Sequence, residues 1–237
     1  MIKAALQYLM SLKDTKVMEV NGESYSTEEL HRIGKVYDPT PIVSPVRIST
    51  LTGLVDYIKE NVDKLTGPLV VHVNSPISVS VYSELRDDAR RHQYIECEAW
   101  TPRIRYGEFM DVENFNIMLQ SCFLENPDRA AILKVAGNIV EENNVTTKDD
   151  GVSQKVVAKA GIARVEEVEV PNPVTLCPFR TFAEVEQPES NFIFRIQAGP
   201  RAAIFEADGG IWRLYAMQNV KAYLNEKLEE CNVKIIS

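Results

Sequence analysis

The stretch Leu176–Arg195, LCPFRTFAEVEQPESNFIFR, carries the clearest strand pattern in the chain and decides its fold class. Between Asn191 and Gln197, large apolar residues occupy every second position, namely Phe192, Phe194 and Ile196. An alternation of period two is typical of a strand with one buried face. We therefore expect an organised strand–turn–strand unit in this part of the chain.

Two arginines lie inside this apolar stretch, Arg180 and Arg195. Arg180 follows Pro178 and stands between Phe179 and Phe182. Because burial of an unpaired charge is costly, such an arginine must reach water or find a partner. The pattern predicts a structural ion pair or an anion site at Arg180 and Arg195, and it names no reaction.

The composition is that of a globular protein, with 237 residues, 45% hydrophobic and 25% charged. This length allows one large domain or two small ones. No apolar run approaches the roughly 18 residues of a membrane helix, and the N-terminal residues lack a signal-peptide pattern. We therefore expect a cytoplasmic protein without membrane contact. Its cysteines form no CxxC pair, which favours free thiols: Cys97, Cys122, Cys177 and Cys231.

The formal net charge is −8. A general binder of duplex DNA usually presents a basic surface, because phosphate neutralisation supplies much of its affinity. The charge argues against that class and leaves room only for a local basic patch.

Strands outnumber helices along the chain and do not alternate regularly with them. This order favours an α+β fold with strand-rich mixed or antiparallel sheets and about four helices. Ala130–Val140 fits either a helix or a strand, and we favour a strand, with Asn126-Pro127 ending the helix before it. The predicted helices are Ile2–Met10, Leu51–Val62 after a cap at Ser49 or Thr50, Asp111–Phe123 and Ala216–Leu228. The predicted strands are Leu69–Val73, Ser78–Tyr82, Val156–Val157, Val165–Val170, Thr181–Val185, Phe192–Ile196, Ala202–Phe205 and Val233–Ile236.

The first part of the chain differs from the rest. Residues 1–68 combine the N-terminal helix, a hairpin turning at Asn21-Gly22 and a proline-rich arm from Pro39 to Pro45. Residues 69–237 form the main α+β domain, although one continuous domain is also compatible with the pattern. The polar stretch Glu141–Gly151 is interpreted as a long hairpin loop or a boundary between subregions.

The sequence contains none of the common nucleotide-binding or hydrolase motifs. The chain has no GxGxxG, no P-loop and no GxSxG, and His31, His72 and His92 share no ligand spacing. We therefore assign no catalytic residue, cofactor or metal, and lean toward a protein that is not an enzyme.

One basic segment could contact nucleic acid. On a helix, Arg86 and Arg90 would share a face, with Asp87 and Arg91 paired beside them. A phosphate-contacting patch of the three arginines would extend to Arg103 and Arg105 and to the stacking rings of Tyr94, Trp100 and Tyr106. The plainer alternative is a solvated, self-paired face, and we favour it because surface ion pairs are common and weak.

A carboxylate cluster and a Gly-Gly turn each allow a functional interpretation and a simpler structural one. Clustered carboxylates at Asp149, Asp150, Glu166, Glu167 and Glu169 would suit Mg²⁺, as in a metal-dependent nuclease. Since two of them alternate with valines, the solvent face of a strand is favoured. Likewise Gly209-Gly210 before Trp212 would let the backbone approach a ligand, but a tight turn leading a buried Trp into the last helix is simpler.

The chain also resembles a family of phage and prophage proteins that includes the enterobacterial prophage protein YfdQ. The resemblance spans roughly residues 70–228, and its motifs are DDGVSQ at 149–154, PFRTFAEVEQPES at 178–190, FIFR at 192–195 and EADGGIW at 206–212, with FMD at 109–111 and ENF at 113–115. It implies a phage or prophage origin, the cytoplasm of a bacterial host, and genes near phage replication and recombination functions. It implies no activity and no catalytic residues.

Three hypotheses follow. The first is a non-enzymatic accessory protein of phage DNA replication or recombination, working as a homo-oligomer through contacts with single-stranded nucleic acid or with a phage or host protein. The second is a structural or sequestering homo-oligomeric assembly, a shell or sponge, in which the N-terminal helix and proline arm exchange between copies. The third, with the least support, is the metal-dependent nuclease.

Overall fold

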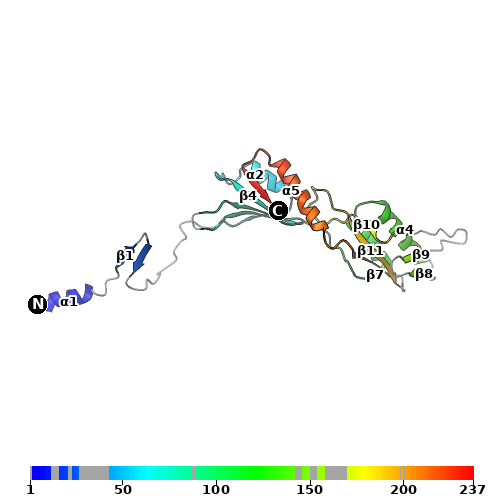
Figure 1. Cartoon of the computed structure of the whole chain (residues 1–237), viewed down its shortest axis with the longest axis horizontal. Coiled ribbons are helices and arrows are strands. Elements are labelled where there is room, and N and C mark those ends of the chain that lie inside the picture. The colour runs from blue at the N-terminus through cyan, green and yellow to red at the C-terminus, as the bar shows by residue number, and fades with distance from the viewer. Residues whose placement is uncertain are drawn as a thin grey trace. The chain divides into compact units, whose positions relative to one another are not determined.

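A computed structural model describes residues 2–11, 16–20, 23–26, 43–86, 89–141, 146–149, 154–157, 170–197, 199 and 201–237. The chain divides into two compact units, Met1–Pro41 and Ile42–Ser237. Figure 1 shows helices that pack on a mixed sheet and on an antiparallel sheet, so the predicted strand-rich α+β class is confirmed. No helix among the described residues is both long and apolar enough to cross a membrane.

The N-terminal unit contains the helix and hairpin that the sequence predicts. Helix α1 is Ile2–Ser11, and strands β1 (Val17–Val20) and β2 (Glu23–Ser26) pair antiparallel. Every side chain from position 2 to position 8 of α1 is exposed.

The larger unit contains a five-stranded sheet in the order β13-β4-β5-β6-β3. Strand β13 is parallel to β4 and β3 is parallel to β6, whereas β5 is antiparallel to both of its neighbours. The strands are β3 (Val46–Ile48), β4 (Leu69–Ser75), β5 (Ser78–Ser83), β6 (Gln93–Glu98) and β13 (Val233–Ile236).

Helices α2 (Leu51–Lys59) and α5 (Trp212–Lys227) cover one face of this sheet (Figure 1). The Thr50 hydroxyl caps α2 by accepting a hydrogen bond from Gly53 N at 3.1 Å, as its residue type favours. The core between helices and sheet includes the fully buried side chains Leu51, Leu54, Val71, Val81, Ile95 and Leu224.

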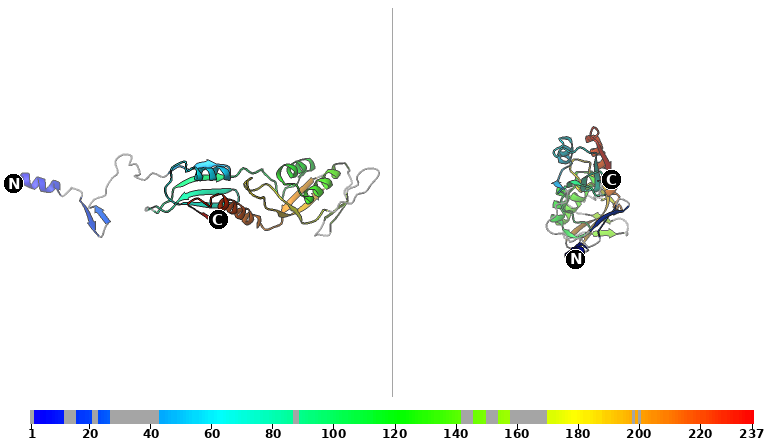
Figure 2. Two further views of the ribbon diagram at one scale, coloured as in Figure 1. Left: turned by 90° about the horizontal axis from the view of Figure 1, so that it is seen from above. Right: turned by 90° about the vertical axis from the view of Figure 1, so that its left-hand side faces the viewer.

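The second sheet is antiparallel throughout, in the order β10-β11-β12-β7. Its strands are β7 (Met110–Asp111), β10 (Val174–Leu176), β11 (Ser190–Gln197) and β12 (Arg201–Glu206). Helices α3 (Val112–Cys122) and α4 (Pro127–Glu141), green in Figure 2, pack against the yellow-to-orange strands. Strand β8 (Thr146–Asp149), which lies in the polar stretch 141–151, pairs antiparallel with β9 (Gln154–Val157), which follows that stretch.

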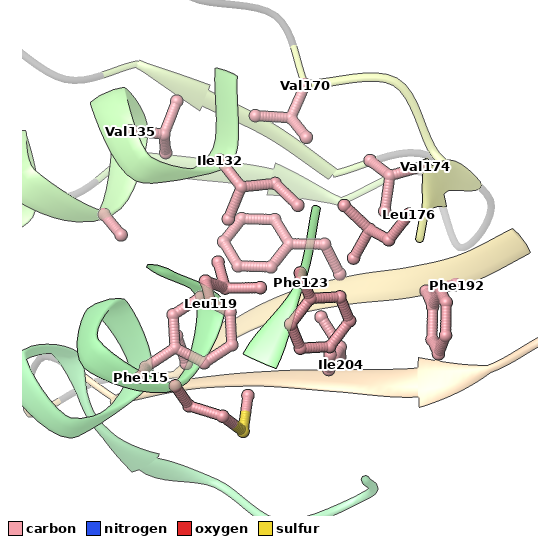
Figure 3. Packing of buried hydrophobic residues seen from close by; sticks show 14 of the residues in the cluster. Phe115, Leu119, Phe123, Ile132, Val135, Val170, Val174, Leu176, Phe192 and Ile204 are labelled. Carbon is pink, nitrogen blue, oxygen red and sulfur yellow. The ribbon is translucent and has the colours of Figure 1, made fainter. Parts of the chain in front are cut away.

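The core of this second sheet explains the alternation from Asn191 to Gln197. Phe192, Phe194 and Ile196 all lie on its buried face. Figure 3 shows side chains of α3 and α4 pointing toward this face, with Phe115 and Ile132 meeting the strands that carry Phe192 and Ile204. Phe192 also stacks on Tyr106, with ring centroids 5.6 Å apart. The strand prediction at 192–196 is therefore confirmed together with its inward face.

Ala130–Val140 is helical, so the preference for a strand there was wrong. Asn126 Oδ1 accepts a hydrogen bond from Arg129 N at 2.7 Å, which is the geometry of a helix N-cap. Pro127 then occupies the first helical position, where its missing N–H costs nothing. Ile132, Val135 and Ala136 are buried at helical spacing. Asn126-Pro127 thus begins a helix rather than only ending the one before it.

Thr181–Val185 is also not a strand, contrary to prediction. The buried amide of Gln187 takes the place of a neighbouring strand: its Oε1 accepts hydrogen bonds from Arg180 N at 3.0 Å and Thr181 N at 3.2 Å, while its Nε2 donates to Phe182 O at 2.9 Å. The segment therefore forms a compact loop. The other strand predictions at 69–73, 78–82, 156–157, 202–205 and 233–236 match β4, β5, β9, β12 and β13, whereas Val165–Glu169 lies outside the described residues.

The division of the chain falls at Pro41/Ile42, ahead of the boundary expected at residue 68. The reason is that the intervening segment supplies parts of the larger unit. Strand β3 pairs with β6, and Leu51 and Leu54 of α2 are fully buried in its core.

Candidate functional site

Arg180 lies in the loop between β10 and β11, and its residue is 6% exposed. Its guanidinium carbon lies 3.9 Å from the centroid of the Trp212 ring and 5.9 Å from that of Phe192. Such stacking of a guanidinium on aromatic faces is attractive and tolerates burial better than an ammonium would. The arginine is therefore held between an aromatic of the four-stranded sheet and the first residue of α5.

Polar partners complete this arrangement. One terminal nitrogen of Arg180 lies 3.4 Å from a Glu206 oxygen, and the other donates to Pro188 O at 3.3 Å and to the Ser190 hydroxyl. The Ser190 hydroxyl in turn donates to Asp208 Oδ2 at 2.6 Å. Burial lowers the pKa of Arg180, while Tyr106, Asp208 and Glu206 act against that shift.

The Arg180 loop joins the two sheets. Phe182 is buried in the core of the five-stranded sheet, and the Thr181 hydroxyl donates to Pro76 O in the β4–β5 turn. Glu184 accepts a hydrogen bond from Thr52 N at 3.2 Å, at the first turn of α2. The charge of Arg180 is compensated by other atoms of the chain at this junction. We therefore infer that Arg180 stabilises the loop between β10 and β11.

Arg195 does not belong to this cluster. It lies on the opposite face of β11, half-buried, and its guanidinium donates to Phe194 O at 3.4 Å. It forms no ion pair with any residue in the described ranges. The structure therefore separates the two arginines that the strand pattern brought together.

Arg86, Arg90 and Arg91 lie at the β5–β6 hairpin, and the helix considered for them is wrong in the described residues. Arg86 N donates to Arg90 O at 3.0 Å, and Ala89, with a φ of 57°, donates back to Arg86 O at 2.9 Å. Since β5 and β6 are antiparallel neighbours, the chain must reverse here. Arg91 is fixed by a hydrogen bond from its guanidinium to Ser83 O at 2.9 Å.

A hollow of about 350 Å³ opens beside this hairpin. Its charged lining consists of Lys64, Arg86 and Glu84, with His92 and Tyr94 next to them. Glu84 lies 3.7 Å from Lys234. The charged lining of this hairpin hollow carries a net charge of +1, a sign that suits an anionic group such as a phosphate.

Arg103 and Arg105 lie beyond the other end of β6 and are exposed. Strand β6 has six residues, which at roughly 3.3 Å per residue separate the two arginine groups by about 20 Å. The predicted patch is thus divided into two. Of its three aromatics, Tyr106 stacks on Phe192 and Tyr94 packs against the core, whereas Trp100 is 89% exposed.

Trp100 borders an open groove of about 560 Å³, which we call the Trp100 groove. Within it, Arg47 Nε of β3 lies 3.2 Å from a Glu96 carboxylate oxygen of β6, because these residues are opposite each other in the parallel ladder. Glu98 is exposed two residues further along β6. The groove therefore combines an indole, a compensated ion pair and a further carboxylate.

The carboxylate cluster considered as a Mg²⁺ site lies almost wholly outside the described residues, which include Asp149 but not Asp150, Glu166, Glu167 or Glu169. Among the described residues, no group of three or more His, Cys, Asp or Glu side chains could hold a metal ion.

Comparisons with known proteins give no relatives. We find no match to a protein-family model, to a curated protein or to a solved structure. The resemblance to phage and prophage proteins therefore stays a prediction.

Trp100 is among the stacking aromatics predicted from the sequence, whereas Arg47 and Glu98 are not among the predicted site residues. The ion pair of Arg47 with Glu96 joins residues 49 positions apart. It depends on the register of two parallel strands, and no local pattern encodes that register.

Proposed function

We propose that the protein is a non-enzymatic accessory protein that works as a homo-oligomer assembled through its N-terminal unit. Its setting would be phage DNA replication or recombination. The observation that carries the oligomer is the exposure of apolar side chains in this unit: Ile2 is 78% exposed, Leu6 54% and Val17 64%.

The elements of this unit are too small to be stable by themselves. An isolated ten-residue helix is marginal in water, and so is a two-stranded hairpin. Ile2 and Leu6 lie four positions apart on α1, so they share one face of that helix. A symmetric contact between identical faces of two copies would bury this stripe, as is usual in homo-oligomers.

The link to nucleic acid rests on two supports. The family resemblance supplies the genetic setting, and the hairpin hollow supplies a lining of net charge +1, with Arg90 and Arg91 in the hairpin beside it. If this surface binds single strands, the paired change Arg90→Glu and Arg91→Glu abolishes binding without unfolding the chain. Single-strand binding that survives this change, or that is absent from the wild type, contradicts this part of the proposal.

The oligomer is tested by native mass spectrometry of the full chain, purified without nuclease. We expect an oligomer for the wild type and a shift to monomer for Leu6→Lys. Leu214→Lys is the matched control, because Leu214 on α5 is also 54% exposed. A wild-type monomer at micromolar concentration overturns the proposal. A large closed particle free of nucleic acid would favour a sequestering shell instead.

A further inference from the structure

We propose that the Trp100 groove binds an arginine- or lysine-bearing segment of another protein. This inference goes beyond the proposed function, since it requires neither the oligomer nor nucleic acid. It rests on the exposure of Trp100, the rigidity of its backbone and the charge of the groove.

Trp100 has the largest exposed fraction of any large hydrophobic side chain among the described residues. Tryptophan is usually highly buried, so an indole that is 89% exposed is unusual for a folded chain. Within the same ranges it makes no ring or cation–π contact, whereas Trp212 is covered by two guanidinium groups. Its faces are therefore available to a ligand.

The backbone on both sides of Trp100 is restricted. Ala99 is buried and its N–H donates to Ile77 O at 2.8 Å. Thr101 precedes Pro102, which restricts Thr101 to extended conformations. The indole is thus presented from an ordered segment, so a partner would not have to pay the entropy of ordering it.

The charge of the groove decides which ligand fits. Its charged lining is Arg47, Glu96 and Glu98, which gives a net charge of −1. The Arg47 guanidinium is already compensated by Glu96, and Glu98 makes no ion pair with a described residue. A phosphate would meet this carboxylate unfavourably, whereas a guanidinium or ammonium could stack on Trp100 and pair with Glu98.

Charge also favours a different protein, rather than a second copy of this chain, as the partner. The chain carries a net charge of −8, so a second copy offers little charge complementarity to an acidic groove. Arg103 and Arg105 follow Trp100 but do not line the groove. They make single-stranded nucleic acid the rival occupant that the experiment must separate.

The test measures binding of a fluorescein-labelled peptide of alternating Gly and Arg to the full chain by fluorescence anisotropy. A citrulline peptide of the same length is the neutral comparison, and labelled oligothymidine is the nucleic-acid comparison. We expect the arginine peptide to bind and the citrulline peptide to bind at least several-fold more weakly. Trp100→Ala and Glu98→Gln should each weaken arginine-peptide binding by about tenfold, the size of a cation–π or charge-assisted contact.

Two variants make the assignment specific. Glu229→Gln removes an exposed charge elsewhere and should leave binding unchanged. Arg47→Gln frees Glu96, so it should strengthen arginine-peptide binding, whereas a nucleic-acid site would be weakened by the same change. Absence of arginine-peptide binding, equal binding by Trp100→Ala and wild type, or tighter binding of oligothymidine through Trp100 would overturn the proposal.

Discussion

At the scale of single residues, Arg180 and Arg213 allow a comparison of burial at constant chemistry. Both guanidinium groups stack on the Trp212 ring, at 3.9 and 4.9 Å from its centroid. Arg180 is buried and hydrogen-bonded at the junction of the sheets, whereas Arg213 is exposed. The contributions of Arg180 and Arg213 to stability should therefore differ mainly because Arg180 alone is tightly packed and forms buried hydrogen bonds.

We predict that Arg180→Ala lowers the free energy of unfolding by about 2–4 kcal/mol, because it removes packed atoms and leaves Ser190 and Pro188 without their donor. Arg213→Ala should cost less than about 1 kcal/mol, the value of an exposed cation–π contact. Urea unfolding of the two variants checks this, and equal losses would show that the junction is not the source of the effect.

The carboxylate of Asp208 gives a prediction for pH. Burial raises its pKa, but hydrogen bonds from Ser190 and Gly210 N and the charge of Arg180 outweigh this, so the pKa of Asp208 lies below its usual value. A depressed pKa means that the ionised form stabilises the fold above the unfolded-state pKa of about 3.9, and that this stabilisation is lost as the pH falls through the folded-state pKa.

Asp208→Asn should therefore reduce the free energy of unfolding at pH 6, and the difference from wild type should shrink below about pH 4. Urea titrations from pH 3 to pH 7 measure it, with Asp56→Asn at an exposed position of α2 as the control. A difference that stays constant over this range would show that the charge of Asp208 has no role.

At the scale of elements, a helix or strand is predictable where its own residues determine it, and is not where distant residues do. The strand at 192–196 was predictable because one buried face imposes a period of two. Helix α4 was not, because a run of apolar residues fits either element and because Asn126-Pro127, which begins this helix, also fits the end of the helix before it. The loop after Arg180 could not be predicted, since the side chain of Gln187 replaces a strand partner.

The role of Asn126 as the N-cap of α4 can be tested by mutation. Asn126 both caps the helix through Oδ1 and ties it to β10, because its Nδ2 donates to Thr175 O at 2.8 Å. We predict that Asn126→Ala costs about 1–2 kcal/mol of unfolding free energy. Asn126→Asp keeps the cap acceptor and loses the donor to β10, so in urea unfolding it should cost less than Ala. Identical costs would mean that the cap contributes nothing.

At the scale of the whole molecule, the fold class and most of the strands follow from the local hydrophobic pattern. The division of the chain into two units and the Trp100 groove depend instead on pairing between distant strands. The sequence pattern groups the segment between residues 42 and 68 with the N-terminal part of the chain, yet its strand β3 joins the five-stranded sheet by pairing with β6. The Trp100 groove arises from the same pairing, because it places Arg47 opposite Glu96.

This difference in the boundary predicts the behaviour of two fragments. Residues 42–237 should fold with a thermal midpoint close to that of the full chain, because they retain both cores, and they should be monomeric if the N-terminal unit forms the oligomer.

Residues 69–237 lose Leu51 and Leu54, which are fully buried, together with the parallel neighbour of β6. Losing two such side chains alone costs several kcal/mol, comparable with the whole stability of a domain, so this fragment should not fold cooperatively. Circular dichroism melting and light scattering measure both properties. A cooperative transition in 69–237 would contradict the partition, whereas an oligomeric 42–237 fragment would place the assembly surface in the larger unit.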